Sequence, residues 1–349
     1  MPISVVKDSI DLAMRHPNKD LTILLFGGEP LLNKPAVDFV IKYSQEQAVI
    51  HDKGMHYSIT TNATLLDDKI NRYLTDYNFG LMVSLDGPRE IHDAQCPTKG
   101  GTGSFDIAAE NIKKLMKLRP VGVRATLTHP MPNLSVIVDF FKDFGFNTMI
   151  IGASINRNDA TSSVDFTEED MNDFVLQSGQ ELPQIIEDLS QDKMPAYFPG
   201  ERWFNAIKNN QITANVFLHN CGAGVAINAI DSKGNLYPCV KFAGMNSWII
   251  GNLANGRDDQ KVKKIWFNFQ KAIKEHCGKC WAYPVCHGPC LWDIALQNGQ
   301  CKFDDFNCKY IKKRIEEAAY LYFQTKIKSE MKEKPNSLPE SDIEFICEK

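Results

Sequence analysis

The sequence predicts an α/β fold with a parallel sheet, followed by a small cysteine-rich domain. Strand-like and helix-like stretches alternate over residues 1–155, and eight of the ten cysteines lie between Cys221 and Cys308. Alternation of this kind is typical of βαβ units, in which helices join parallel strands. The length of 349 residues suffices for two domains of ordinary size.

Residues 1–155 contain five strand-like stretches, which are 21–26, 56–61, 80–85, 121–127 and 148–153. Helix-like stretches with apolar residues every three or four positions separate them, and the clearest are 36–43, 67–74 and 107–118. Parallel α/β folds bind ligands at the carboxyl ends of their strands. We therefore expect functional residues directly after these strands.

The chain opens on a helical pattern. Ser4 is the predicted N-cap, and an apolar stripe follows it at Val6, Ile10, Ala13 and Met14. Because a βα fold ordinarily opens on a strand, we expect a first strand to be missing.

The rest of the chain divides into three predicted segments. Residues 156–215 have a polar helical pattern and form a connector, with a helix cap at Thr167 to Asp170. Residues 216–325 hold the clustered cysteines and a helix that begins near Cys308. Residues 326–349 become polar and contain two prolines after Met331, so we expect a loose tail.

Composition limits the class of protein. The apolar fraction is 43%, the charged fraction is 23% and the net charge is -4, as in a soluble globular protein. Lys and Arg total 39 against 43 acidic residues, so no general positive field favours nucleic acid. No apolar run reaches the length of about 18 residues that a membrane span needs, and no signal peptide follows Met1. We expect a cytoplasmic protein with no nucleic-acid or membrane partner.

The cysteines form two blocks with metal-ligand spacing. The first is Cys221-x12-Gly234-x4-Cys239, where residues 231–235 predict a hairpin turn that brings the two thiols together. The second is Cys277-x2-Cys280-x5-Cys286-x3-Cys290, followed by Cys301 and Cys308. Seven or eight thiolates are too many for one tetrahedral ion, so spacing leaves two zinc ions or two iron–sulfur clusters open. Disulfides are a third alternative, which the absence of a signal peptide disfavours.

The two blocks in this order resemble the SPASM domain, the auxiliary-cluster module of radical S-adenosylmethionine (SAM) peptide-maturing enzymes. The resemblance implies two auxiliary 4Fe–4S clusters. Their implied ligands are Cys221, Cys239 and Cys290 for the first cluster, and Cys277, Cys280, Cys286 and Cys308 for the second. A fourth ligand for the first cluster is not evident, and Cys301 is predicted to be a spare buried thiol.

The strand ends of the first half carry a matching resemblance. Phe26-Gly27-Gly28-Glu29-Pro30 looks like the GGEP motif that holds the methionine amino group of SAM, and Arg124 is placed to pair with its carboxylate. A tight turn for the glycines and a salt bridge for Arg124 remain open alternatives. The residues that the resemblance assigns to SAM are Gly27, Gly28, Glu29, Pro30, Thr61, Asn62, Ser84 and Arg124.

Two departures from the family pattern stand out. The position four after His92 is usually Arg in the family and is Cys96 here, which we predict to be an ordinary thiol because no ligand spacing surrounds it. The C-x3-C-x2-C loop for the SAM-cleaving cluster is absent. We expect a truncated start, a third 4Fe–4S cluster only if that segment is restored, and no SAM cleavage by the chain as written.

The resemblance implies a partial (β/α)6 radical SAM barrel that lacks its first strand, followed by a small α+β SPASM domain. It further implies an enzyme that modifies a ribosomally made precursor peptide, with flavodoxin or ferredoxin as electron donor. Three short motifs together look like the thioether-forming branch, and they are Cys221-Gly222-Ala223-Gly224, Tyr237-Pro238-Cys239 and Cys280-Trp281-Ala282. Sulfatase-maturating enzymes place a general-base Asp after the counterpart of Cys239, where this chain has Val240. Sulfatase maturation and a non-catalytic iron–sulfur scaffold remain alternatives.

Overall fold

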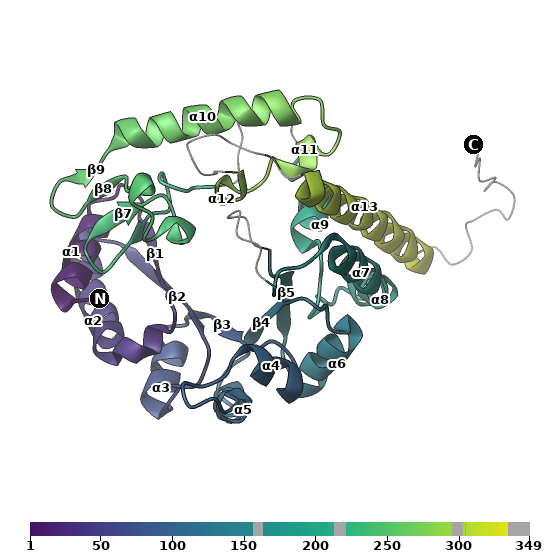
Figure 1. Ribbon diagram of the computed structural model, residues 1–349, viewed down its shortest axis with the longest axis horizontal. Coiled ribbons are helices and arrows are strands. Elements are labelled where there is room, and N and C mark those ends of the chain that lie inside the picture. The colour runs from purple at the N-terminus through teal and green to yellow at the C-terminus, as the bar shows by residue number, and fades with distance from the viewer. Residues whose placement is uncertain (156–162, 213–220, 295–302, 304, 334–349) are drawn as a thin grey trace, which may run out of the picture.

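The computed structural model describes residues 1–155, 163–212, 221–294, 303 and 305–333. They form a parallel sheet with covering helices, a helical layer, and a small cysteine-rich unit that lies across the open side of the sheet (Figure 1). Cys301 and Cys347 fall outside the described residues.

The first sheet is wholly parallel, and its strands follow one another in chain order. They are β1 (Asp20–Leu25), β2 (Gly54–Thr61), β3 (Gly80–Ser84), β4 (Gly122–Leu127) and β5 (Thr148–Ala153). The segments between them form η1 (Pro30–Asn33), α2 (Lys34–His51), α3 (Asp68–Asp76), α4 (Arg89–Gln95), α5 (Phe105–Met116) and α6 (Leu134–Phe144). Each strand lies within two residues of its predicted bounds, so the predicted α/β fold is confirmed.

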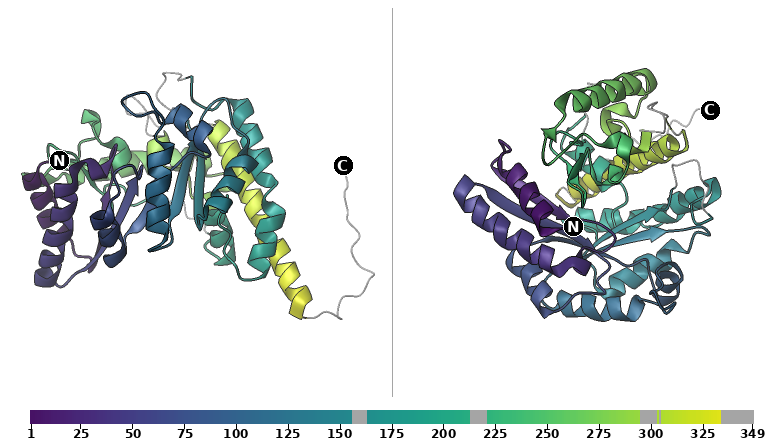
Figure 2. Two further views of the ribbon diagram at one scale, coloured as in Figure 1. Left: turned by 90° about the horizontal axis from the view of Figure 1, so that it is seen from below. Right: turned by 60° about the vertical axis from the view of Figure 1, so that its left-hand side comes forward.

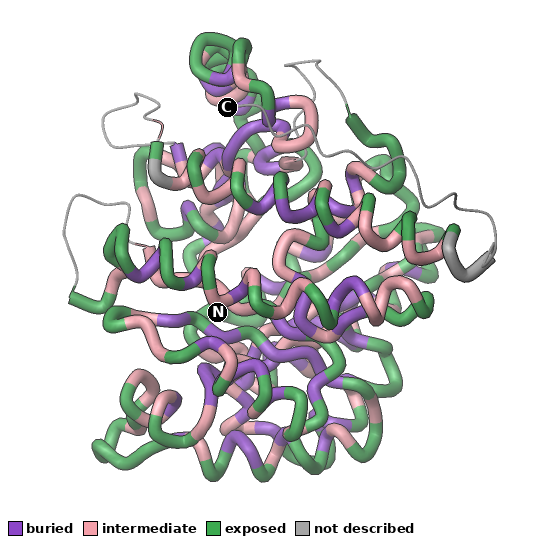
Figure 3. Tube along the Cα trace, turned by 90° about the vertical axis from the view of Figure 1, so that its right-hand side faces the viewer, coloured by how far each residue is buried: buried purple, intermediate pink, exposed green. Residues whose placement is uncertain are grey.

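Alternating burial along β4 shows how the sheet is covered. Val123, Ala125 and Leu127 are buried against the helices, whereas Arg124 and Thr126 are exposed on the other face. Successive strand residues point to opposite faces, so one face carries the apolar core and the other remains available for polar groups. Figure 3 shows buried residues concentrated in the strands and on the adjoining helix faces.

Helix α1 (Ile3–Met14) buries the predicted stripe at Val6, Ile10 and Met14, but the predicted N-cap at Ser4 is wrong. Pro2 is the N-cap, and its carbonyl accepts the N–H of Val6 at 3.1 Å. The helix therefore starts before Ser4, which lies exposed in the first turn and makes no capping hydrogen bond.

The predicted connector contains three helices, α7 (Glu168–Gly179), α8 (Leu182–Ser190) and α9 (Glu201–Lys208). The predicted cap is confirmed as a capping box, in which Thr167 and Asp170 exchange side-chain and backbone hydrogen bonds. The long helix α13 (Asp305–Glu333) packs on this layer. It begins three residues before Cys308 and continues through positions 326–333, which the sequence assigns to the tail.

The cysteine-rich unit is built on a small antiparallel sheet of β6 (Ala229–Ile230), β7 (Asn235–Tyr237), β8 (Gly251–Asn252) and β9 (Gly256–Arg257). The predicted hairpin turn is confirmed, because the Asp231 carboxylate accepts the N–H groups of Lys233 and Asn235 while Gly234 takes a φ of +81°. The other elements are η2 (Val240–Phe242), η3 (Asn246–Trp248), α10 (Asp259–Cys277), α11 (Tyr283–Cys286) and α12 (Leu291–Ile294).

One contact joins the cysteine-rich unit to α1, and another joins α13 to α7 within the helical layer. Leu12 of α1 packs on a buried cluster that includes Leu236 and Ile250 of the small sheet. On the other side, Arg314 of α13 is fully buried and donates to Glu317 at 2.6 Å and to the Ser178 hydroxyl of α7. Figure 2 shows the resulting arrangement, with the cysteine-rich unit facing the side of the sheet that α2 to α6 leave uncovered.

Candidate functional site

The carboxyl ends of β1 and β2 are joined through Glu29. Its Oε1 accepts hydrogen bonds from the Leu31 N–H and the Thr61 hydroxyl, both at 2.9 Å, and its Oε2 accepts the Asn62 N–H at 2.7 Å. A carboxylate offers about four acceptor positions, so Glu29 retains capacity for a further donor such as an ammonium group. The structure thus brings together Glu29, Thr61 and Asn62.

Gly27 and Gly28 lie exposed between β1 and Glu29. A Cβ atom added to either glycine would meet no other atom within 4 Å, and neither has the positive φ that a tight turn would demand. The fold itself therefore does not require glycine here. Open space above the backbone suits close approach of a ligand. Pro30 follows as the first residue of η1, which Glu29 caps.

Ser84 and Arg124 are register partners at the ends of β3 and along β4. Arg124 is exposed on the face of the sheet opposite the helices. Within the described part of the chain, its guanidinium makes no hydrogen bond or ion pair, so the salt-bridge alternative for Arg124 finds no partner there. A guanidinium in this position can bind a carboxylate through two parallel hydrogen bonds.

Four cysteines from three elements converge at the end of α10. Burial, together with the neighbouring thiols of Cys308, Cys286 and Cys280, raises the pKa of the Cys277 thiol to about 12. The pKa of Cys286 is likewise raised by burial, with additional effects from Cys308 and Cys280. The structure therefore brings together the four thiols that the resemblance assigns to one cluster.

The other group is less closely gathered. Cys239 and Cys221 interact across the hairpin, and burial raises the pKa of Cys239. Burial also raises the pKa of Cys290, and the charge of Lys241 acts against this rise at both Cys239 and Cys290. Cys290 and the hairpin thus share a neighbour, and Lys241 also pairs with Asp293 at 3.7 Å.

Backbone N–H groups donate to three of the sulfurs. Each donation lowers the pKa of the thiol, against the larger effect of burial, which raises it. The donors lie two or three residues after the cysteine, and the pairs are Cys239 with Lys241 and Phe242, Cys286 with Gly288, and Cys290 with Trp292 and Asp293. Such N–H groups stabilise thiolate charge and are among the features that tune iron–sulfur sites.

The spacing of the thiols distinguishes the candidate metals. Four thiolates around one zinc ion lie about 3.8 Å apart, given Zn–S bonds of about 2.3 Å. Among the described residues, no three cysteine sulfurs lie within 4.8 Å of one another. As placed in this structure, the four thiols around Cys277 are spaced more widely than the ligands of one zinc ion, which favours an inorganic core of several irons. Their environment is apolar, with Phe269, Ile273 and Tyr283 in the same buried cluster.

Sequence reasoning missed one group at the end of β3. Cys96, predicted to be an ordinary thiol, donates to Asp86 at 3.4 Å, and the buried His92 lies beside both. The tight turn after β3 brings these residues together, and spacing of six and four residues gave no signal of a shared site.

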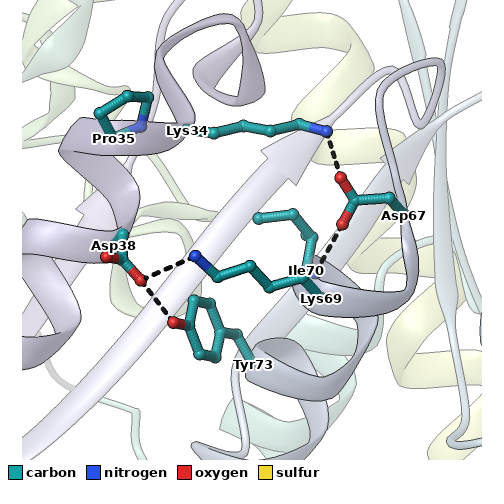
Figure 4. Close-up of a pocket in the computed structure, with 7 residues that line it drawn as sticks. All are labelled: Lys34, Pro35, Asp38, Asp67, Lys69, Ile70 and Tyr73. Carbon is teal, nitrogen blue, oxygen red and sulfur yellow. Dashed lines mark hydrogen bonds and ion pairs between the residues drawn. The ribbon is translucent and has the colours of Figure 1, made fainter.

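A pocket of about 320 Å³ lies in the outer helix layer (Figure 4). Its lining residues are Lys34, Pro35, Asp38, Asp67, Lys69, Ile70 and Tyr73. Figure 4 shows Lys69 and Tyr73 contacting Asp38, while Lys34 contacts Asp67. These hydrogen bonds lower the pKa of Asp38 to about 2. The charges pair across α2 and α3, so we assign this pocket to helix packing.

Comparison with known proteins agrees with this arrangement. Residues 3–144 match the family model of the Radical SAM superfamily. The chain is 24% identical over 311 residues to a cysteine-type anaerobic sulfatase-maturating enzyme of Clostridium novyi (strain NT), covering 83% of this chain and 78% of that protein. It is 26% identical over 274 residues to the mycofactocin maturase MftC of Mycobacterium tuberculosis, covering 76% of this chain and 64% of that protein.

Solved structures match over a greater length. Native anSMEcpe with bound AdoMet superposes with a TM-score of 0.71 at 19% identity, covering 95% of this chain and 91% of that chain. The same protein with bound AdoMet and the Kp18Cys peptide gives a TM-score of 0.69 at 20% identity. No described helix is long and apolar enough to cross a membrane. Residues 3–144 of this chain therefore resemble the Radical SAM superfamily in sequence, and nearly the whole chain has the fold of anSMEcpe.

Proposed function

We propose that this chain binds SAM and two auxiliary 4Fe–4S clusters and acts in the maturation of a ribosomally made peptide, forming a thioether crosslink. The observation that carries the proposal is that one chain has both features. Glu29, Thr61 and Asn62 form a polar group at the carboxyl ends of the strands, and two groups of cysteines lie on the unit that faces the sheet. The cysteine-rich unit lies over the face of the sheet that exposes Arg124.

SAM binding rests on groups of opposite charge. The Glu29 carboxylate accepts a hydrogen bond from the SAM ammonium group at its remaining acceptor position, and Arg124 pairs with the SAM carboxylate. Thr61 and Asn62 hold the Glu29 carboxylate in place, and Ser84 is the register neighbour of Arg124. Gly27, Gly28 and Pro30 shape the backbone at this corner.

The proposed cluster ligands are Cys277, Cys280, Cys286 and Cys308 for one cluster, and Cys221, Cys239 and Cys290 for the other. When bound, SAM supplies, after one-electron reduction, the radical that takes a hydrogen atom from a peptide carbon. The protein orients the peptide, excludes water and holds thiolates for the clusters. We propose an acidic electron carrier of the flavodoxin or ferredoxin type as reductant.

Sulfatase maturation is the second candidate, favoured by the sulfatase-maturating relative and by the fold of anSMEcpe. Against it, Val240 stands directly after Cys239 and begins η2, so this position offers no carboxylate base. The two activities leave different products. A thioether removes two hydrogen atoms from the peptide and blocks one cysteine, whereas formylglycine carries an aldehyde.

The test uses the protein expressed anaerobically from its genomic locus, with SAM, a reductant and two peptides. One peptide is a cysteine-rich peptide encoded beside the gene, and the other is a cysteine-type sulfatase peptide. We expect the first to lose two hydrogens and to resist alkylation at one cysteine in mass spectrometry. Reaction of the second peptide with a hydrazide probe, and no change in the first, would instead establish sulfatase maturation.

SAM binding is testable without turnover. Glu29→Gln removes the negative charge but keeps an acceptor, so we expect SAM affinity to fall about tenfold, or roughly 1.4 kcal/mol, in equilibrium dialysis. Glu90→Gln, on α4, is the matched control and should leave affinity unchanged.

We also propose that the 349-residue chain alone binds SAM without reductive cleavage, because its sequence contains no C-x3-C-x2-C segment. The measurement is chromatographic detection of 5′-deoxyadenosine after incubation of this chain with SAM and dithionite. Stoichiometric formation would refute this statement while leaving the SAM-binding proposal intact.

A further inference from the structure

The segment from the end of β3 through α4 holds a group of ligand-type side chains that neither the proposed SAM site nor the proposed clusters use. Asp86, His92 and Cys96 each present one ligand atom, and these three atoms lie within 4.8 Å of one another. They are the one such group among the described residues. We propose that Asp86, His92 and Cys96 bind a zinc ion.

The distances approach those of a tetrahedral site. Asp86 Oδ2 lies 3.4 Å from Cys96 Sγ and 3.9 Å from His92 Nδ1. Zinc bonds of about 2.3 Å to sulfur and about 2.0 Å to oxygen and nitrogen require separations of about 3.5 Å for sulfur to oxygen and about 3.3 Å for nitrogen to oxygen. The first separation is already met, and a small side-chain rotation closes the second.

The histidine is held in the required tautomer. Ser104 donates its hydroxyl hydrogen to the Cys96 carbonyl at 2.6 Å, so its oxygen accepts from His92 Nε2–H at 3.0 Å. Nδ1 therefore carries the lone pair, which accepts the Asp86 N–H at 3.2 Å. Metal-binding histidines usually donate their other ring N–H to a fixed acceptor, as here. Zinc would take this lone pair in place of the Asp86 N–H.

The carboxylate is also fixed and lacks a cation. Oδ1 of Asp86 accepts the Thr126 N–H at 2.8 Å, which leaves Oδ2 as the ligand atom. Asp86 is only 9% exposed, and Asp93 adds a second negative charge near His92 and Cys96. In the described part of the chain, no lysine or arginine lies within ion-pair distance of either carboxylate. A buried negative group of this kind is stabilised by a bound cation.

The donor set selects the metal. Thiolate, imidazole and carboxylate together suit zinc, whereas magnesium and calcium prefer oxygen ligands alone. Binding forms three metal–ligand bonds and releases the Cys96 thiol proton to solvent. Three protein ligands leave the fourth tetrahedral position for water or an added thiol, which is the arrangement of catalytic rather than structural zinc sites. This inference does not rest on the proposed peptide chemistry.

The experiment uses the full chain, isolated anaerobically with its iron and sulfide. One equivalent of zinc chloride is added, and unbound zinc is then removed by desalting. We expect one zinc per chain by mass spectrometry of the metals, with unchanged iron. Zinc-edge X-ray absorption should show a single sulfur ligand and lighter nitrogen and oxygen ligands. Cys96→Ser should reduce the zinc content at least tenfold at unchanged iron, and Cys347→Ser, which also removes one thiol, should retain it.

Two results would overturn the proposal. One is full zinc retention by Cys96→Ser, and the other is a zinc site with three or four sulfurs, which would place the ion among the cluster cysteines. Thermal unfolding distinguishes a loss of zinc binding from a folding defect of the variant. Zinc should raise the melting temperature of the wild type and of Asp93→Asn but not that of Cys96→Ser, and an equal rise in all three would also count against the site.

Discussion

The parallel-sheet half and the cysteine-rich unit of this protein are stabilised in different ways. The sheet half has a continuous apolar core that runs from Val6 to Tyr197 and fills the space between five strands and their helices. The cysteine-rich unit has strands of only two or three residues, and its main buried cluster includes Cys277 with three further cysteines packed against it. Its thiols are themselves part of the core.

This difference separates two sources of stability. Burial of apolar area is sufficient for the first region, because it contributes about 25 cal/mol per Å². The second region is small, and units of that size usually depend on metals or other cross-links. Loss of the proposed clusters should therefore act on one half of the molecule and leave the other folded.

Removal of the iron of the proposed clusters should have the largest effect. Chelation under anaerobic conditions would leave seven buried or partly buried thiols without metal. Structural metal binding contributes on the order of 10 kcal/mol to folding of small domains. We expect amide hydrogen exchange in α10 and α11 to become fast, while β2 and β4 keep their protection. Protection of α10 in the iron-free protein would show that apolar packing alone sustains this unit.

A cavity in the apolar core should destabilise the sheet half rather than the cysteine-rich unit. Phe141 is fully buried in α6 and packs edge-on against Phe146. Phe141→Ala should lower the free energy of unfolding of the sheet half by about 3–5 kcal/mol in urea denaturation. The matched control is Phe267→Ala on α10, which is 68% exposed and should change it by less than about 0.5 kcal/mol. An equal loss in both variants would contradict the division of stability.

The same contrast explains what the sequence could and could not predict. The strands and the Glu29 corner were found because alternation and short motifs are local. The length of α13 was missed, since Lys326 to Glu330 reads as polar tail although Lys328 pairs with Glu187 on α8 at 2.9 Å. The group of Asp86 and Cys96 was missed because a turn, rather than ligand spacing, creates it.

A smaller, pH-dependent effect is expected at the junction between the sheet and α7. Burial raises the pKa of Asp170, but hydrogen bonds from Thr167, His129 and Met131 outweigh it, so the pKa lies well below the usual 3.8. Because the pKa of Asp170 is lower in the folded state, its carboxylate stabilises the fold at a pH above the unfolded-state pKa. This stabilisation is lost as the pH falls toward the folded-state pKa.

Asp170→Asn should therefore cost about 2 kcal/mol at neutral pH. The free energies of unfolding of wild type and variant, measured by urea titration from pH 7 downward, should begin to converge below about pH 4. A gap that stays constant over this range would mean that the charge of Asp170 has no part in the effect.

The smallest effect concerns the start of the chain. Ser4 makes no capping hydrogen bond, whereas the Asn133 side chain caps α6 by accepting the Ser135 N–H at 3.0 Å. Ser4→Ala should change the free energy of unfolding by less than about 0.5 kcal/mol. Asn133→Ala should cost about 1 kcal/mol, the usual value of an N-cap. Both residues lie in the sheet half and are measured in the same urea titration, so a larger loss for Ser4→Ala than for Asn133→Ala would restore Ser4 as the cap that the sequence predicts.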